Sequence, residues 1–458
     1  MSVEVTETSL NLIPAGYKQT EVGVIPEDWK CYSFGDLVDY KKGYAFKSDE
    51  YGKTGIRIIR VSDTSYSGIK DDSPIFISDK LAKLYHAWSI KEGDLIFSTV
   101  GSKPPMYDSL VGKAIYVTKK YEGSLLNQNA VRIRAKSKTE GIQSLLLNHF
   151  RTERYIDFIE LIFRGNANQA SITLENLFEF KIPLPRLEKE QTAIANALSD
   201  VDALISELEK LIAKKQAIKT ATMQQLLTGR TRLPQFALRE DGTPKGTKPS
   251  ELGEIPVDWE VVCFSQCGYF QSGSGFPTKY QGKQEGDYPF FKVSDMNNVG
   301  NENNLINSNN YISETVRNLI SAKLIPVNAI VFAKIGAAIF LERKKICFQT
   351  SCIDNNMMAY IVNDKKLYYK YAYLLFKNIN LAQFVEATAL PSLSGRDIGQ
   401  KIVALPTSEE QTAIATILSD MDAEIQALEQ RLGKTRQIKQ GMMQELLTGK
   451  TRLPYDEE

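Results

Sequence analysis

The sequence predicts two mixed α/β domains and two long antiparallel coiled-coil helices, arranged as an internal repeat. Two observations predict this α/β (α+β) fold class. The nonapeptide LLTGRTRLP at residues 226–234 returns as LLTGKTRLP at residues 446–454. Ahead of each copy, apolar residues recur at alternating spacings of four and three, the pattern of a coiled-coil helix. Such similarity within one chain indicates a duplicated architecture.

The length and composition are those of a soluble protein with two domains. At 458 residues the chain is too long for one compact core. Its 43% hydrophobic and 24% charged residues are ordinary fractions, and no apolar run approaches the ~20 residues of a membrane span. The first fifteen residues lack the basic start and apolar block of a secretory signal. We therefore expect an N-terminal tail at residues 1–15 and a cytoplasmic protein.

Three segments occur twice, in the same order. GYKQTEVGVIPEDW at residues 16–29 returns as GTKPSELGEIPVDW at residues 246–259. EQTAIANALSDVDALISELEKLI at residues 190–212 returns as EQTAIATILSDMDAEIQALEQRL at residues 410–432, and each is followed by its LLTG-TRLP copy. The repeat is cyclic, because the segment that would follow the second LLTG-TRLP stands at residues 16–29. We expect a pseudo-twofold molecule in which the last copy docks beside residues 16–29.

Each apolar stripe predicts a helix of ~40 residues, or ~60 Å. Ser408 and Gln411 fit a capping box at the start of the second helix, and Gly229 and Gly449 are typical of helix ends. The two stripes most simply pack on each other, and pairing with the helix of a partner chain is the alternative. The residues expected at the helix–helix and partner interface are Ile194, Leu198, Val201, Ile205, Leu208, Ile212, Ile414, Leu418, Met421, Ile425, Leu428 and Leu432.

The regions between the repeats differ in sequence but share an order of elements. Each has β-rich runs (residues 56–63, 94–101 and 112–118, then 289–295, 328–336 and 355–362), followed by a helical run, a polar loop and a β-like return. This order predicts a first domain at 16–185, a first spacer helix at 186–232 and a linker at 233–250. A second domain at 251–406 and a second spacer helix at 407–454 follow.

Residues suited to catalysis or to metal binding are scarce. The chain has only two histidines and an odd number of cysteines, five. The pairs Cys263/Cys267 and Cys347/Cys352 miss the C-x2-C spacing of zinc knuckles, so we expect buried thiols and no metal. There is no GxxxxGK[ST] loop, no GxSxG elbow and no Asn-Pro-Pro-aromatic run. We expect no catalytic residues, and a chain that forms no bond by itself.

The doubled EQTAIA…MQ-LLTG-TRLP signature and the doubled GxIPxDW segments resemble the specificity subunit of type I restriction–modification enzymes. The likeness spans nearly the whole chain, in the family's order. It implies that each mixed domain is a target recognition domain that reads one half of a split, asymmetric sequence in double-stranded DNA. It also implies that the helices fix the distance between the half-sites and bind two modification subunits.

The resemblance places the cofactors on those partners and none on this chain. The modification subunits carry S-adenosylmethionine and methylate adenine at N6. Two restriction–translocation subunits in the full complex bring ATP and Mg²⁺. The near-identity of the repeated helices is then explained by a partner that needs the same surface twice.

The residues that contact DNA are expected at loop positions of the two variable regions, residues 30–182 and 261–404, each of which has five more basic than acidic residues. Arginine, lysine, asparagine and glutamine bridge phosphates and base edges. The candidates are Lys47, Arg60, Lys103, Arg164, Asn166, Asn168, Gln169, Lys279, Lys292, Lys334, Ser394 and Arg396. Arg60 and Lys292 occupy equivalent positions in RVSD and KVSD, which predicts a shared role such as phosphate contact.

Three alternatives remain open at this stage. The chain could serve a modification-only or regulatory system that lacks a nuclease subunit. It could be a scaffold whose two mildly basic domains bind protein rather than DNA. It could also be a single-chain enzyme with a divergent active site, which methylation by the purified chain with S-adenosylmethionine alone would reveal.

Overall fold

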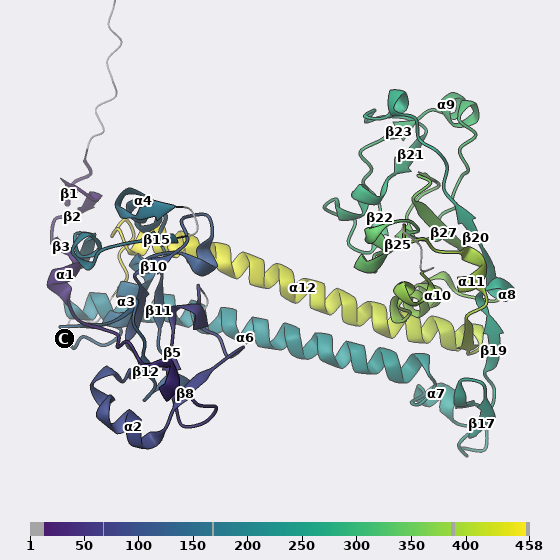
Figure 1. Cartoon of the computed structure of the whole chain (residues 1–458). Coiled ribbons are helices and arrows are strands. Elements are labelled where there is room, and N and C mark those ends of the chain that lie inside the picture. The colour runs from purple at the N-terminus through teal and green to yellow at the C-terminus, as the bar shows by residue number, and fades with distance from the viewer. Residues whose placement is uncertain (1–12, 67, 167–168, 386–389, 455–458) are drawn as a thin grey trace, which may run out of the picture. The chain divides into compact units, whose positions relative to one another are not determined.

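The chain forms two compact units, seen in a computed structural model that describes residues 13–66, 68–166, 169–385 and 390–454. Unit 1 contains the described residues up to Glu209 together with those from Gln430 onward, and unit 2 is Lys210–Glu429. Both boundaries fall inside long helices, α6 (Glu188–Leu227) and α12 (Ser408–Leu446). Each unit therefore contains one mixed domain and a part of both helices (Figure 1).

The sheets of unit 1 are antiparallel apart from one parallel pair. The largest has the order β11-β9-β13-β4, and a second has the order β12-β5-β8 with β12 and β5 parallel. The bounds of these strands are β4 Val38–Lys42, β5 Ile56–Ile59, β8 Ile75–Ile77, β9 Leu95–Ser98, β11 Ala114–Tyr116, β12 Leu125–Leu126 and β13 Ala130–Ala135. They contain the β-rich runs predicted from the sequence.

Short elements complete unit 1. Its other strands are β1 (Tyr17–Thr20), β2 (Gly23–Pro26), β3 (Trp29–Ser33), β6 (Thr64–Ser65), β7 (Gly68–Ile69), β10 (Val100–Gly101), β14 (Arg164–Asn166), β15 (Gln169–Ser171) and β16 (Lys181–Pro185). Its shorter helices are α1 (Phe34–Leu37), α2 (Asp79–Leu84), α3 (Ile142–His149), α4 (Glu153–Ile162) and α5 (Leu174–Phe178). The pairs are β1·β2, β3·β16 and β6·β7, and β10, β15 and β14 form a third sheet.

Unit 2 repeats this strand order. Its main sheet, β20-β27-β24-β25-β22, matches β4-β13-β9-β11 with one added strand, and β23-β21-β26 matches β8-β5-β12, again with one parallel pair. These strands are β20 Gly268–Ser272, β21 Tyr288–Phe291, β22 Asn304–Leu305, β23 Tyr311–Ile312, β24 Ile330–Ala333, β25 Lys344–Cys347, β26 Cys352–Ile353 and β27 Met357–Val362. The prediction that one architecture is present twice is confirmed.

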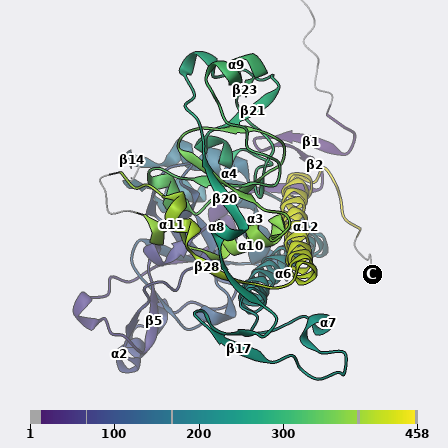
Figure 2. The same ribbon diagram turned by 90° about the vertical axis from the view of Figure 1, so that its right-hand side faces the viewer.

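The remaining elements of unit 2 are short. They are α7 (Pro234–Ala237), β17 (Thr247–Ser250), β18 (Gly253–Pro256), β19 (Glu260–Cys263), α8 (Phe264–Cys267), α9 (Glu314–Leu319), α10 (Tyr369–Asn378), α11 (Gly395–Gly399) and β28 (Ile402–Leu405). The hairpin β17·β18 corresponds to β1·β2, and β19·β28 corresponds to β3·β16. Helix α9 lies beside β21 and β23 in both views (Figure 1 and Figure 2).

An aromatic cluster forms the core of each mixed domain. In unit 1 Phe150, at the end of α3, packs on Phe34 with ring centroids 4.6 Å apart. In unit 2 Phe376, on α10, packs on Phe264 at 4.8 Å. All four rings are nearly or fully buried, and burying such a side chain stabilises a fold by ~1.5–3 kcal/mol. These equivalent contacts show which residues of α3 correspond to which residues of α10.

The long helices pair antiparallel within each unit, as predicted. In unit 1 Asp202 of α6 accepts hydrogen bonds from Lys439 of α12 at 2.7 and 2.8 Å, and Ile194 and Leu198 pack near Met443. In unit 2 the corresponding pair is Lys219 of α6 with Asp422 of α12, and Leu226 and Leu227 pack near Ile414 and Leu418. The stripes therefore meet within one chain rather than requiring the helix of a partner.

The second LLTG-TRLP copy docks beside residues 16–29, as predicted from the cyclic repeat. The Tyr17 hydroxyl donates a 3.0 Å hydrogen bond to the carbonyl of Gly449. Gly449 has φ +69° and packs so closely on Pro26 that a Cβ would lie 2.5 Å from the proline Cδ. Gly229 has φ +68° and meets Pro256 in the same way, at 2.4 Å. Glycine is therefore required by both the backbone conformation and the close contact.

Three local predictions are wrong. The polar stretch after α4 is not a loop: β14 and β15 form a hairpin that pairs with β10, which buries Ala170. Arg396 lies on helix α11 rather than in a loop, because the Ser394 hydroxyl accepts the N–H of Asp397 and starts the helix there.

The third wrong prediction is the capping box at the start of α12. Thr407, one residue earlier than Ser408, accepts the N–H of Glu410 at 3.4 Å. The side chain of Gln411 instead binds backbone groups of the mixed domain, accepting the N–H of Tyr368 at 2.8 Å and donating to the carbonyl of Lys366. Tertiary contact thus takes the side chain that the local pattern assigned to the cap.

Candidate functional site

The three repeated segments meet at one arginine in unit 2. Arg232 of LLTGRTRLP donates from Nε to Glu410 of EQTAIA at 3.0 Å and from Nη1 to Asp258 of IPVDW at 2.8 Å. Glu410 is buried and also accepts the indole N–H of Trp259 at 3.0 Å. The planar guanidinium binds two carboxylates at once, a geometry that lysine cannot reproduce.

Unit 1 contains the same node, which we call the arginine fork. Arg452 donates to Glu190 from Nη2 at 2.7 Å and to Asp28 from Nη1 and Nη2 at 3.1 and 2.9 Å. Glu190, like Glu410, is 1% exposed. The repetition of all three segments therefore has a structural reason, since each supplies one member of a contact that occurs in both units.

None of the twelve residues expected at the helix–helix and partner interface is fully exposed to solvent. Seven are buried, namely Ile194, Leu198, Leu208, Ile212, Ile414, Leu418 and Ile425. The other five, Val201, Ile205, Met421, Leu428 and Leu432, are half-buried. A contact with a partner subunit stays a prediction for these positions.

Three of the segments that contain predicted DNA contacts surround one open pocket of about 610 Å³ in unit 1. Val61 and Ser62, next to Arg60, line one side. Gly101, two residues before Lys103, lines another, together with Ser171, whose pairing partner on β14 is Arg164. We call this the RVSD pocket, after the segment at residues 60–63.

None of the described candidates of unit 1 is itself in the pocket's lining, and the other candidates lie on other segments. Lys47 is exposed, and its backbone N–H donates to Glu50. Asn166 and Gln169 pair with each other on β14 and β15, so their backbones lie on the hairpin. Asn168 lies outside the described residues.

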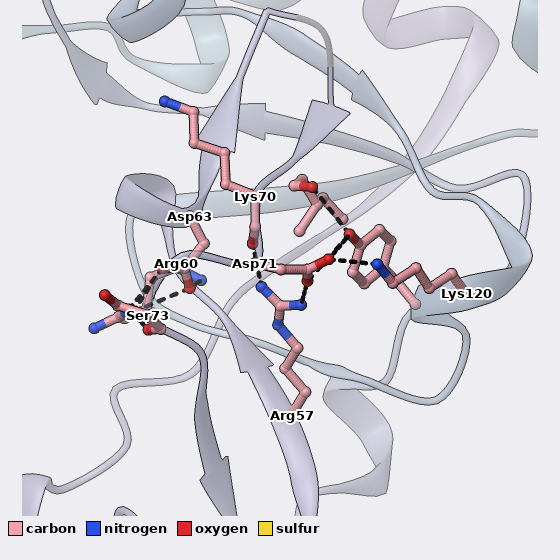
Figure 3. Close-up of polar contacts among 9 residues, drawn as sticks. Arg57, Arg60, Asp63, Lys70, Asp71, Ser73 and Lys120 are labelled. Atoms are coloured by element: carbon pink, nitrogen blue, oxygen red, sulfur yellow. Dashed lines mark hydrogen bonds and ion pairs between the residues drawn. The ribbon is translucent and has the colours of Figure 1, made fainter. Parts of the chain in front are cut away.

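Three cations in this part of unit 1, Arg57, Arg60 and Lys120, are already paired with carboxylates (Figure 3). Arg60 donates from Nε to Asp63 at 3.0 Å and from Nη2 to the carbonyl of Ser73 at 2.7 Å. Asp71 binds both Lys120 and Arg57, and hydrogen bonds from these two cations lower the pKa of Asp71 to about 2. These charges are therefore largely neutralised within the domain.

Lys70 differs from these cations, because its side chain extends away from Asp63 and Asp71 (Figure 3). It is exposed at the pocket, and its ammonium forms no hydrogen bond or ion pair with a described residue. Its backbone, by contrast, is held by bonds to Asp63 and Arg57. A fixed backbone with an unpaired ammonium is suited to binding an anion.

Lys113 lies beneath the same pocket and is 2% exposed. Its ammonium donates to the carbonyls of Thr64 and Asp108, each at 2.7 Å, and forms no ion pair with a described residue. Burial, aided by the nearby charge of Lys70, lowers the pKa of Lys113 to about 8. Asp108 also lines the pocket, and its carboxylate offsets the charge of Lys113 only in part. A buried cation without an ion pair is energetically costly, so this pocket is an electropositive site.

The candidates of unit 2 do not gather around a single pocket. Lys279 lies over the ring of Tyr280 at 4.8 Å, beside a separate cavity of about 750 Å³. Lys292 donates from Nζ to Gln281 at 3.0 Å, and Lys334 donates to Ser272 at 3.1 Å. Ser394 caps α11, from which exposed Arg396 projects.

RVSD and KVSD share a structural feature that the sequence did not identify. Asp63 accepts the backbone N–H of Arg60 at 2.9 Å, and Asp295 accepts that of Lys292 at 2.8 Å. Each buried aspartate thus closes a 3₁₀ turn. Sequence reasoning also missed Lys70 and Lys113. A usable signal for Lys113 was its position in the apolar run VGKAIYV, which predicts burial of the charge.

The described residues contain no group of three or more His, Cys, Asp or Glu side chains placed to hold a metal ion. Cys267, Cys347 and Cys352 are buried thiols, whereas Cys31 and Cys263 are half-buried. Among the described helices, none combines the length and apolarity needed to cross a membrane.

A sequence profile described as the type I restriction modification DNA specificity domain matches this chain twice, at residues 26–220 and 256–440. The chain belongs to this family. Each match begins at the IP-DW segment and ends within a long helix, so the family's unit of repetition agrees with the repeat found in the sequence and in the strand order.

Curated relatives are specificity subunits, and one of them covers nearly the whole chain. The putative type I restriction enzyme MjaX specificity subunit of Methanocaldococcus jannaschii is 28% identical over 444 residues, which is 95% of this chain and 97% of that protein. The type I restriction enzyme EcoAI specificity subunit of Escherichia coli is 26% identical over 207 residues, 44% of this chain and 32% of that protein.

Solved structures show the same fold at low identity. The crystal structure of the type I restriction-modification system S subunit from M. genitalium aligns with a TM-score of 0.54 at 17% identity, over 91% of this chain and 96% of that one. A chain from a study of complex assembly and conformational transition of the type I R-M system aligns with a TM-score of 0.52 at 14% identity, over 93% and 99%.

Proposed function

We propose that this chain is the non-catalytic DNA specificity subunit of a type I restriction–modification system. Each mixed domain reads one half of a bipartite, asymmetric DNA sequence. The paired helices set the distance between the half-sites and present matching surfaces to two modification subunits.

The observation that carries this proposal is the contrast between what is repeated and what is not. The arginine fork and the strand order recur in both units, whereas the charged side chains around them differ. Two domains with one scaffold and different polar surfaces are suited to two different DNA sequences, because base edges are read by individual polar side chains.

The proposed partners supply the chemistry. Two modification subunits bring S-adenosylmethionine and transfer its methyl group to adenine N6, and two restriction–translocation subunits bring ATP and Mg²⁺. The proposal assigns no bond-making step to this chain. Its own residues bind and orient DNA, so that a target adenine in each half-site lies within reach of a modification subunit.

For DNA contact we propose the segments around the RVSD pocket in unit 1 and the exposed cations of unit 2. Arg164 and Lys103 are exposed in unit 1, and Lys279 and Arg396 are exposed in unit 2. Exposed cations on the two domains add attraction to phosphates, while polar side chains beside them discriminate between bases.

Methylome sequencing tests this function. The chain is expressed with its modification partner in cells that lack other adenine methyltransferases. The expected result is methyladenine at a split, asymmetric motif with a fixed gap, modified in both halves. A palindromic motif, or no methylation above background, would contradict the proposal. Replacing residues 30–182 with the corresponding domain of another family member should change one half of the motif only.

Two alternative systems are separated by simple observations. A modification-only system would show the same methylation, but no gene for an ATPase–nuclease subunit would lie nearby. A protein-binding scaffold would assemble with partners and yield no sequence-dependent methylation.

A further inference from the structure

We propose that the RVSD pocket is an anion site that binds one phosphate of the DNA backbone through Lys113 and Lys70. This inference deepens the proposed function and rests on it. It assigns the contact to two lysines outside the polar segments in which the sequence predicted DNA contacts.

The first argument is that the charge of Lys113 is only partly compensated. Its ammonium has three N–H donors, of which two are used by the carbonyls of Thr64 and Asp108. Carbonyl oxygens solvate a buried ammonium but do not neutralise it. The carboxylate of Asp108 offsets part of the charge but forms no ion pair with Lys113. An anion entering the pocket would supply the missing charge and accept the third hydrogen bond.

The second argument is the composition of the pocket. Its charged lining consists of Lys70, Lys113 and Asp108, a net charge of +1. The carboxylate of Asp108 lies 3.4 Å from the backbone N–H of Tyr66, which it accepts. With a volume of about 610 Å³ the pocket is open and roomy enough for a phosphate group, and Lys70 stands on its rim as a second donor.

The third argument is a comparison with unit 2, where one of the two buried lysines of the matching strand is neutralised. The other, Lys345, donates to the carbonyl of Glu302 and forms no ion pair with a described residue. Lys344 on β25 forms an ion pair with Glu342 and donates to the carbonyl of Ile379. The strands correspond because Ala114 pairs with Phe97 on β9 as Lys344 pairs with Phe332 on β24. A buried lysine in this fold can thus have its own carboxylate, which Lys113 lacks.

The expected contact positions DNA without reading its sequence, because a phosphate is the same at every base pair. Lys113→Met and Lys70→Ala should therefore weaken binding of the assembled methyltransferase to cognate and scrambled DNA by the same factor. We expect about tenfold for Lys113→Met, and a fall of about 0.9 in the slope of log K against log salt, as for the loss of one phosphate contact.

Lys120→Ala is the matched control. Lys120 is an exposed lysine of the same domain, but its charge is already used by Asp71. Its substitution should leave both the affinity and the salt slope unchanged. Lys70→Arg, which keeps the charge, should retain the wild-type slope.

Fluorescence anisotropy over a range of salt concentrations measures all five proteins in complex with the modification subunit. Unchanged slopes in both Lys113→Met and Lys70→Ala, with normal wild-type binding, would overturn the phosphate site and leave the proposed function intact. A wild-type complex with no preference for its own methylation motif would overturn the proposed function instead. If Lys113→Met fails to assemble, the exposed Lys70→Ala variant decides.

Inorganic phosphate separates a DNA phosphate from a free anion. Melting of the full chain is followed with added phosphate at constant ionic strength. Stabilisation of the wild type but not of Lys113→Met, combined with unchanged DNA slopes, would assign the pocket to a small anion and overturn the DNA contact.

Discussion

Units 1 and 2 share their strand order and arginine fork but differ in the charges that they bury. In unit 1 Lys113 is buried without a counter-ion, and His149 is buried with no partner for its Nε2 among the described residues. In unit 2 the buried Lys344 has Glu342, and the position of His149 is taken by Leu375, since Phe150 and Phe376 occupy the same place. Duplication has thus preserved the strand order and the arginine fork, which together we call the frame. The polar residues of each domain have diverged.

The comparison explains why some segments are similar in sequence between the two halves. Segments that contribute to the fork are similar in both halves because three side chains must meet in a fixed geometry. Positions outside the fork tolerate substitution, as where Leu375 takes the place of His149. Substitutions at matched positions of the two units can therefore separate the frame from the recognition surface.

The largest effect is expected at the arginine fork. Arg232→Ala leaves Glu410 buried without its counter-ion and should destabilise unit 2 by about 3–5 kcal/mol. Arg452→Ala should destabilise unit 1 by less, because Arg452 is 34% exposed against 9% for Arg232 and water can replace part of the contact. Urea unfolding followed by hydrogen exchange assigns each loss to its unit.

Arg230 and Lys450 provide controls, since each is exposed and lies two residues before a fork arginine. Their alanine variants should unfold like the wild type. Equal losses for Arg232→Ala and Arg452→Ala would show that burial does not set the strength of the fork.

An acid-sensitive difference between the units is expected from His149. Burial, with a contribution from Arg154, lowers the pKa of His149 to about 3, so the folded state keeps this side chain neutral while the unfolded chain protonates near pH 6.5. Between these values the unfolded state binds more protons, so stability falls as pH falls, by about 1.4 kcal/mol per pH unit. His149→Leu, which copies Leu375, should remove this dependence from unit 1.

The measurement is the difference in unfolding free energy between wild type and His149→Leu from pH 7 to pH 4. Carboxylates common to both proteins cancel in that difference. A difference that does not change with pH would mean that His149 gains a proton or a partner in the folded state.

The smallest effects are expected at the RVSD and KVSD positions. Both Arg60→Ala and Lys292→Ala should weaken DNA binding of the complex alike for all sequences, as phosphate contacts do. Arg60 is already bound to Asp63, whereas Lys292 donates only to the neutral Gln281, so Lys292→Ala should have the larger effect, within about tenfold. Anisotropy with cognate and scrambled DNA tests this, and full affinity of both variants at moderate salt would remove them as DNA contacts.

The frame of this protein could be predicted from the sequence because its signals are local or repeated. The stripe from Ile194 to Ile212 specifies a helix by its period, and the second copy supports the first. The cyclic order of segments then predicted the contact between Gly449 and residues 16–29. The hydrogen bond from Tyr17 to Gly449 joins residues that are 432 positions apart in the chain. No contact had to be guessed from propensity alone.

The recognition surface could not be predicted in the same way. β14 and β15 form because β10 offers pairing partners from a distant segment, and polar residues in RGNANQAS give no sign of that strand. Likewise, Lys113 is unusual only because Thr64 and Asp108 surround it, and both contacts depend on the fold. An isolated cation belongs to no periodic pattern and no repeat in the sequence. The tertiary structure therefore decides whether it is paired.

Unit 1 is assembled from two separate stretches of the chain, which has a consequence for its folding during synthesis. Unit 2 is one continuous stretch, Lys210–Glu429, so it can finish folding as soon as that stretch has left the ribosome. Unit 1 needs both early residues and those after Gln430, including Arg452, whose partners Asp28 and Glu190 are made hundreds of residues earlier. The domain that is made first is thus completed last, and until then its helix face at Leu198 lacks the cover that Met443 and Leu446 provide.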